Sequence, residues 1–546
     1  MNTDKHRYFM RIITGKLLKN RLSLSVFICV HLWIILLTSC TSKPTDLRTV
    51  IPADALVYLE SNDLGKAIGA ITENKIFQQL AKSKPDLSAL DGIKLAVAVT
   101  GFETSEEQIT EENSVLNFQP RFVAAVETNA WNFQAVSFTE NKIGEFINDV
   151  YGGSVELETS DKHGGKYFVW TAQDGRKAYA LVQGSVIFFG NDEPAIEKCL
   201  AVKRGEADSI AKNAKVTALP ADSLASGYVS TDGVAQIANI VGVKFANEAG
   251  EEPEVQSAIA GILPQLLRGS ISEVVWTATK TEKGIEDKYL IAMPPDVANV
   301  FAETLVETGK PQFSLLDRLP DSTSRVTLYD LTNPLVAWHS VLLVAQKQTD
   351  PLTGKIVEVF SSALFEEYGV RDAEMFLASV GPTIVTANMD ESGDKQVVIA
   401  SIKDKDKLLK SLTAPLKLTT VSYQNGRIEL LRSDDQEFAA DINGETIVLG
   451  ETESVLRLLS DGRSPDKQGS LISKMQTGRP AAAITVAIES TKAREIVNLL
   501  TEKKDDNLKV ETSYFIETRF TKTGIERHTV SDFGLIGSII EQFGKE

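Results

Sequence analysis

Cysteine is almost absent from this chain of 546 residues, which contains Cys29, Cys40 and Cys199 and no others. The first two lie in, or directly after, an apolar N-terminal segment, so the remainder of the chain holds Cys199 alone. A disulfide framework needs pairs of cysteines, and the sequence therefore excludes one. Cys199 shares a predicted helix face with Ile196, so we expect a buried thiol that behaves as a small hydrophobic group.

Histidine is nearly as scarce, and the three histidines after the N-terminal segment, His163, His339 and His528, are far apart in sequence. Neither a His-x-x-x-His nor a Cys-x-x-Cys spacing occurs, so the sequence predicts no metal and no cofactor. The acidic stretch Asp390–Asp394 lacks the ligand spacing of a known calcium loop, and we expect it to be an exposed turn.

Familiar catalytic motifs are also missing: the chain has no Gly-x-Ser-x-Gly elbow, no phosphate-binding loop and no Gly-x-Gly-x-x-Gly turn. Ser-x-x-Lys spacings occur at Ser209–Lys212 and Ser392–Lys395, and Lys522–Gly524 reads Lys-Thr-Gly, a set similar to that of serine acyl-enzymes. Turns and a hairpin glycine explain these residues more simply. Carboxylates are too numerous for a catalytic pair to be chosen, so we assign no catalytic residue and favour a non-enzymatic protein.

Basic residues are outnumbered by acidic ones, since 57 Lys and Arg stand against 74 Asp and Glu for a net charge of −17 at pH 7. Without residues 1–39, which hold six basic residues and one acidic residue, the charge would be about −22. Such a surface is repelled by nucleic-acid phosphates, and we expect no nucleic-acid partner.

The N-terminal segment has the composition of an export signal. A basic stretch is followed by the mainly apolar run Leu22–Leu37, and Leu37-Thr38-Ser39-Cys40 resembles the lipobox of bacterial lipoproteins. The resemblance implies that residues 1–39 are a signal peptide and that Cys40 is acylated, with palmitate for example. The apolar run is short for a membrane span, which needs about 20 residues. An uncleaved anchor and plain secretion are the alternatives, and translation can start at Met1 or Met10.

A lipidated Cys40 would make the membrane the first partner of this chain and place it in the bacterial cell envelope. The spacer, residues 40–49, is short: the nine residues after Cys40 reach at most about 30 Å at roughly 3.3 Å each. Thr41, rather than aspartate, follows the cysteine and favours the outer membrane. Whether the body faces the periplasm or the cell surface stays open.

The chain also resembles itself. Tyr179–Gly190 aligns with Ala439–Gly450 at a uniform offset of 260, which also carries Pro220 onto Pro480. The repeat predicts a duplication.

Two further matches set the limits of the repeat. Ile51–Glu60 is similar to Leu319–Asp330, and Lys283–Glu286 is similar to Thr523–Glu526, both in the same order. We therefore predict two homologous halves, residues 50–312 and 318–546, with a linker near Gly309-Lys310-Pro311 between them.

The local patterns predict an α+β fold of mixed or antiparallel sheets with helices packed on one face. Strands are expected in β-rich runs at Leu95–Val99, Phe122–Val126, Val186–Phe189, Val274–Ala278, Gln396–Ile399, Thr446–Leu449 and Phe515–Phe520. Tight turns are expected at Asp174-Gly175, Gln183-Gly184 and Asn443-Gly444. Helical spacing of apolar residues occurs at Ile143–Val150, Leu335–Ala345 and Ala493–Leu500.

Short phrases within the body carry a second resemblance. Leu-Pro-Ala-Asp precedes an apolar strand at Leu219–Asp222, Tyr-Ala-x-Val-x-Gly lies at Tyr179–Gly184, and Glu-Pro-Ala-Ile follows at Glu193–Ile196. Together they resemble a large uncharacterised family of bacterial exported or lipid-anchored proteins, a domain of unknown function. The resemblance covers most of residues 50–300 and, more faintly, 318–530. It implies no catalytic residues.

These observations lead to two hypotheses of function. The first is a membrane-anchored envelope lipoprotein that acts as a non-enzymatic binding or scaffolding module, with a groove between its halves for an envelope protein or glycan. The second is an envelope-polymer hydrolase whose catalytic carboxylates the sequence does not single out.

Overall fold

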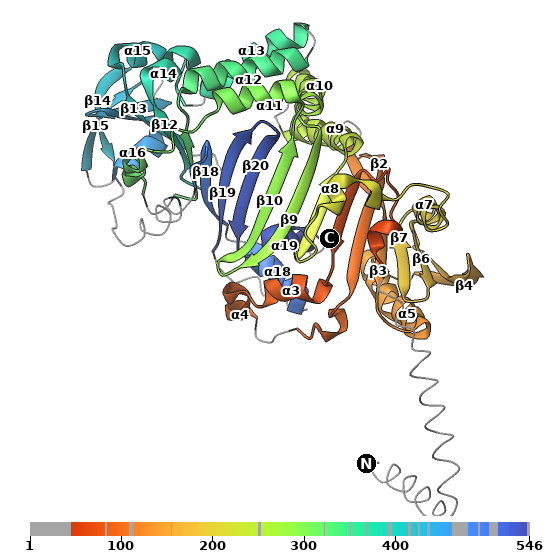
Figure 1. The fold of residues 1–546 in the computed structure, drawn as a ribbon. Coiled ribbons are helices and arrows are strands. Elements are labelled where there is room, and N and C mark those ends of the chain that lie inside the picture. The colour runs from red at the N-terminus through yellow and green to blue at the C-terminus, as the bar shows by residue number, and fades with distance from the viewer. Residues whose placement is uncertain are drawn as a thin grey trace, which may run out of the picture. The chain divides into compact units, whose positions relative to one another are not determined.

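The strands of this chain join edge to edge into one antiparallel sheet in the computed structural model (Figure 1). The structure describes residues 45–546 except those at 82–84, 109–113, 154, 249–252, 321–322, 350, 367, 391–395, 413–415, 424–425, 434–436, 461–474, 476–478, 490–491, 502–510 and 543–546.

The sheet has 20 strands in the described part of the chain. The first ten are β1 Val57–Ser61, β2 Lys94–Gln108, β3 Ser114–Glu127, β4 Glu156–Lys162, β5 Gly165–Thr171, β6 Lys177–Gln183, β7 Val186–Gly190, β8 Ala225–Val229, β9 Glu273–Thr281 and β10 Gly284–Ala292. The second ten are β11 Arg325–Asp330, β12 Val380–Asn388, β13 Gln396–Ile402, β14 Lys417–Tyr423, β15 Gly426–Arg432, β16 Phe438–Asn443, β17 Thr446–Glu451, β18 Ala483–Glu489, β19 Thr512–Thr521 and β20 Gly524–Ser531.

The two sets of ten strands are arranged alike. From its outer edge inward, the first set runs β4, β5, β6, β7, β3, β2, β1, β8, β9, β10. The second set runs β14, β15, β16, β17, β13, β12, β11, β18, β19, β20, which is the same order with ten added to every number. The two sets meet where β10 pairs with β20, and we call this ladder the seam.

The seam is close to two-fold symmetric. Lys288 and His528 face each other at its centre, and each is the fourth residue after the glycine that begins its strand. Those glycines, Gly284 and Gly524, have φ values of 128° and 134°. A Cβ on either one would overlap a backbone carbonyl oxygen of the opposite strand. Only glycine fits there, which explains why Lys-Gly-Ile-Glu and Thr-Gly-Ile-Glu share it.

The helices before the seam are η1 Leu47–Thr49, α3 Leu64–Thr72, α4 Lys75–Leu80, η2 Ser88–Leu90, α5 Asn132–Phe138, η3 Thr139–Ile143, α6 Gly144–Val150, α7 Glu193–Lys203, η4 Ile210–Lys212, α8 Ala214–Thr217, α9 Thr231–Glu248 and α10 Pro253–Ser270. Between β10 and β20 in sequence lie α11 Pro295–Thr304, η5 Phe313–Arg318, α12 Pro334–Gln348, α13 Pro351–Glu366, α14 Ala373–Ser379, α15 Lys405–Ser411, α16 Thr452–Ser460 and α18 Lys492–Thr501, and α19 Gly534–Gln542 follows β20.

The α+β class is confirmed, but helices pack on both faces of the sheet and not on one. Tyr228 pairs with Val275, and because side chains alternate along a strand, Trp276 points to the opposite face. The core around Tyr228 includes Ile196 and Leu200 of α7. The core around Trp276 is instead formed with α3, α4, α18 and α19. Strands buried on both faces explain the many apolar runs that do not alternate.

Local predictions agree with the structure where it describes them. Each predicted β-rich run lies within a strand, and Gly175, Gly184 and Gly444 turn their hairpins with positive φ. Asn333 caps α12, since its side chain accepts the Val336 N–H at 3.2 Å. No helix in the described residues is long and apolar enough to cross a membrane.

The compact body begins at Leu47, which is buried, so η1 belongs to the core and not to a spacer. The region expected to link two halves is structured as well. Leu315 and Leu316 of η5 are buried in the core of the second strand set. The division into halves at 50–312 and 318–546 stays a prediction, and the repeated strand order supports it.

Candidate functional site

The lipidation candidate, Cys40, lies outside the described residues, as does the Ser392–Lys395 pair. The three histidines lie on separate elements. His163 is in the β4–β5 turn, His339 in α12 pairs with Glu374 at 2.9 Å, and His528 in β20 lies 3.6 Å from Glu286. The described residues contain no group of three or more His, Cys, Asp or Glu that could hold a metal ion.

The residues that resembled a serine acyl-enzyme set have structural roles. Ser209 precedes η4, and Lys212 pairs with Asp208 on the surface. Lys522 and Thr523 form the turn between β19 and β20, and Gly524 begins β20. Cys199 is fully buried in α7, as expected, and burial raises the pKa of its thiol to about 12. A thiol with such a pKa is protonated at neutral pH and unreactive.

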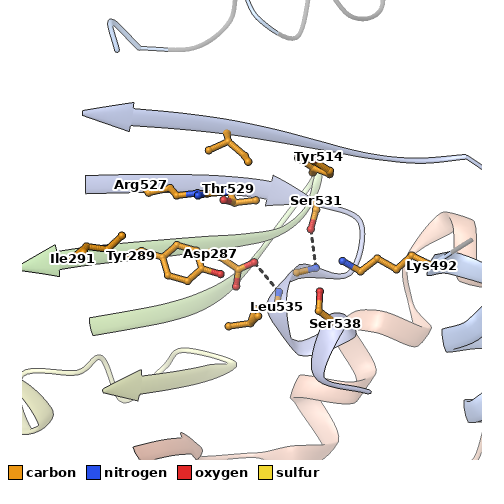
Figure 2. A pocket seen from close by; sticks show the side chains of 12 residues that line it. Asp287, Tyr289, Ile291, Lys492, Tyr514, Arg527, Thr529, Ser531, Leu535 and Ser538 are labelled. Atoms are coloured by element: carbon orange, nitrogen blue, oxygen red, sulfur yellow. Dashed lines mark hydrogen bonds between the residues drawn. The ribbon is translucent and has the colours of Figure 1, made fainter. Parts of the chain in front are cut away.

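A pocket of about 460 Å³ opens on the seam, on the face of the sheet that carries Trp276 (Figure 2). We call it the seam pocket. Its lining comes from β10, α18, β19, β20 and α19: Asp287, Tyr289, Ile291, Lys492, Tyr514, Ile516, Arg527, Thr529, Ser531, Gly534, Leu535 and Ser538. Strands of both sets therefore form its floor.

Strand register fixes which floor residues are neighbours. Asp287 pairs with Thr529, and Tyr289 pairs with Arg527. Asp287 and Arg527 occupy equivalent positions, because each is the third residue after the glycine that starts its strand. The floor of the pocket thus carries an acid at one position and a base at the matching position.

Asp287 is almost fully buried, with 1% of its surface exposed. Its Oδ1 accepts the indole N–H of Trp276, and its Oδ2 accepts the backbone N–H of Leu535 near the start of α19, both at 2.9 Å. Burial raises the pKa of Asp287, and the two hydrogen bonds oppose that shift. Asp287 thereby fixes α19 against the sheet (Figure 2).

Gly534 allows this close approach. It begins α19 with φ of 60°, and a Cβ there would lie 2.5 Å from Cγ2 of Ile285 and 3.1 Å from Oδ2 of Asp287. Its N–H donates to the hydroxyl of Ser531 at 2.9 Å. A side chain at this position would push α19 away from Asp287 and change the wall of the pocket.

Two cations and two aromatic rings give the pocket its chemical character. Lys492 reaches from α18 toward the start of α19, and Arg527 lies on the floor beside Tyr289 (Figure 2). Burial raises the pKa of Tyr289, so its ring stays neutral and its hydroxyl protonated. Tyr514 pairs with Ser531 across the neighbouring ladder.

A scan against family models and searches of curated proteins and of solved structures find no match to this chain. The resemblance to exported lipoproteins stays a prediction from the sequence motifs.

The residues of the seam pocket are scattered over about 250 positions of sequence, from Asp287 to Ser538, and none of them belongs to a recognised motif. One signal was available. Two acids, Glu286 and Asp287, follow the glycine that the repeat shares at Gly284, and an acid that is buried is rare without a function or a buried partner. Its partners, Trp276 and Leu535, could not be identified from sequence because nothing local connects them.

Proposed function

We propose that this chain is a lipid-anchored bacterial envelope protein that binds a ligand or a partner in the seam pocket, and that Cys40 is its anchor. The pocket carries the proposal: it lies where the two strand sets meet and combines cations, aromatic rings and hydroxyl groups in one concave surface. Pockets of this size and mixed lining are typical of binding sites for small ligands or for exposed parts of larger ones.

The hydrolase alternative has less support from this pocket. Among the residues that line it, Asp287 is the one carboxylate, and both of its oxygens already accept hydrogen bonds. Glycoside hydrolysis ordinarily requires two carboxylates on opposite sides of the bond that breaks. A binding role needs no second carboxylate.

A photo-crosslinking experiment in cells tests the binding role. We expect a crosslinkable phenylalanine analogue at Tyr289 to give a specific adduct in the envelope fraction. The matched control is Leu290, whose side chain points to the opposite face of the sheet. Equal adducts from both positions, or none from Tyr289, would contradict binding in the pocket.

Metabolic labelling tests the anchor. Radiolabelled palmitate should enter the wild-type protein and not the Cys40→Ala variant, which should leave the membrane fraction. Undiminished label in that variant would remove lipidation at Cys40 from the proposal while leaving the pocket untouched.

A further inference from the structure

We propose that the seam pocket selects a ligand that carries an oxyanion, either a carboxylate or a phosphate, attached to a planar group. This inference rests on the proposed binding function and specifies the chemistry of the ligand. The evidence is which charged groups around the seam have ion-pair partners, which aromatic rings lie in the pocket and how large the cavity is.

The guanidinium of Arg527 is the first part of the evidence. It is exposed to solvent at the floor of the pocket, and it makes no ion pair or hydrogen bond to any group that the structure describes. Cations on the opposite face of the same strands are paired: Lys288 with Glu286 at 3.1 Å, and Arg519 with Glu517 at 3.6 Å. Arg527 therefore keeps its donors available to a ligand.

Asp287 and Arg527 form no ion pair in the described part of the chain. The oxygens of Asp287 are taken by Trp276 and Leu535, and the residue opposite Arg527 in the ladder is Tyr289. Lys492 adds a second cation: 18% of its side chain is exposed, its amine lies 3.9 Å from the Glu489 carboxylate, and its charge also acts on Asp287. The pocket is thus a positive site on a chain whose net charge is −17.

The geometry of a guanidinium suits an oxyanion. Its N–H groups form a planar fork that matches two oxygens of a carboxylate or a phosphate. Tyr289 pairs with Arg527, so one aromatic ring lies beside the place where the anion would bind, and Tyr514, which pairs with Ser531, lies further along the floor of the pocket. Rings of this kind stack on planar groups, and a cavity of about 460 Å³ holds one such group with its anion.

Four small aromatic probes that differ in charge test the proposal on the purified protein: benzoate, phenyl phosphate, benzyl alcohol and benzylamine. Ligand-observed NMR measures their dissociation constants. We expect benzoate or phenyl phosphate to bind at least tenfold more tightly than the neutral and cationic probes. The tighter of these two anions shows whether the site takes carboxylates or phosphates.

Variants assign the effect to Arg527. Arg527→Gln should weaken binding of the preferred anion at least tenfold, and Arg527→Glu should reverse the preference toward benzylamine. Lys288→Gln is the matched control, because Lys288 lies on the same ladder and faces away from the pocket, and it should change affinity less than twofold. Melting temperatures and circular dichroism establish that each variant is folded.

The outcomes separate this inference from the proposed function. Equal or tighter binding of the neutral or cationic probe, or unchanged anion affinity in folded Arg527→Gln, would overturn the oxyanion proposal and leave the pocket as a binding site. Failure of all four probes to bind would overturn the oxyanion proposal and count against the pocket itself.

Discussion

The buried carboxylate of Glu60 is bound by two neighbouring side chains, Arg48 and Tyr58. Arg48 in η1 binds Glu60 of β1 through Nε at 2.8 Å and through a second guanidinium nitrogen, and the Tyr58 hydroxyl donates to the same carboxylate at 2.8 Å. Only 7% of the Glu60 side chain and 15% of the Arg48 side chain are exposed. This pair ties the start of the body to the sheet, a few residues after the expected anchor.

Removal of Arg48 should therefore be costly. Arg48→Met leaves the Glu60 carboxylate buried without its cation, and we expect a loss of about 3–5 kcal/mol in the free energy of unfolding. Urea denaturation measures it. The double variant Arg48→Met with Glu60→Gln should regain part of that stability, and a double variant as unstable as the single one would contradict the charge argument.

Asp287 gives a prediction about pH. Its pKa is raised in the folded protein, so the folded state holds this proton more tightly than the unfolded state does. The resulting stability is present below the ordinary aspartate pKa and is lost as pH rises through the folded pKa.

Asp287→Asn should remove this pH dependence. The asparagine amide has one acceptor oxygen, so either the Trp276 indole N–H or the Leu535 N–H loses its acceptor, at a pH-independent cost of about 1–3 kcal/mol. Urea denaturation between pH 3.5 and 7 should show a difference from wild type that shrinks as pH rises. A difference that stays constant across this range would mean that the pKa of Asp287 is not raised.

At the level of elements, the seam pocket depends on where α19 begins. The helix starts at Gly534 in a left-handed conformation, close to Ile285 and Asp287. The sequence shows Gly534 after Asp532-Phe533 but not which strand it faces, because the nearest contact lies about 250 residues away. Helix periodicity was sufficient to predict α12 and α18, and it carried no information on the position of α19 against β10.

Gly534→Ala should destabilise the protein by roughly 2–3 kcal/mol, since the positive φ costs about 1–2 kcal/mol and the new methyl group overlaps Ile285. Gly261, in the middle of α10 with no atom near a built Cβ, is the matched control. Gly261→Ala should be neutral or stabilising by up to about 1 kcal/mol. Thermal unfolding compares the two, and equal effects would contradict the role given to Gly534.

Across the whole molecule, the predicted halves share both a sheet and a core. The core around Trp276 contains Ile71 and Phe77 from the first part of the chain, and Ile496 and Phe533 from the last. The side chain of Asn74 also donates to the Asp532 carbonyl at 2.9 Å. Sequence repeats indicate which segments are alike, but not that equivalent strands pair with each other at β10 and β20.

We expect the body, residues 47–546, to unfold in a single cooperative transition, because neither strand set completes this core alone. Residues 47–309 produced separately should bind a hydrophobic dye and lack a sharp transition, since Ile71, Phe77 and Trp276 would be uncovered. Calorimetry measures the unfolding transitions, and dye fluorescence measures the exposed apolar surface. Two independent transitions in the intact body would show that the halves are stable domains.

The features that could be predicted from sequence are those formed by residues close to one another along the chain. Hairpins, caps and the duplication phrases depend on neighbouring residues, and Asn333, Gly184 and Gly444 were identifiable from local patterns alone. The seam pocket depends on contacts between residues more than 200 positions apart, such as Tyr289 with Arg527. No local pattern encodes such contacts.

The matched positions of Asp287 and Arg527 have a consequence for how such a pocket can arise. Two identical subunits meeting along a β10-like ladder would set two aspartates on one floor, and a β20-like pair would set two arginines there. Like charges so close would repel each other or draw in counterions. A single chain that contains both strands escapes this restriction, because each strand can change without the other. A chain that contains both strands can therefore carry different side chains at symmetry-related positions, whereas a homodimer cannot.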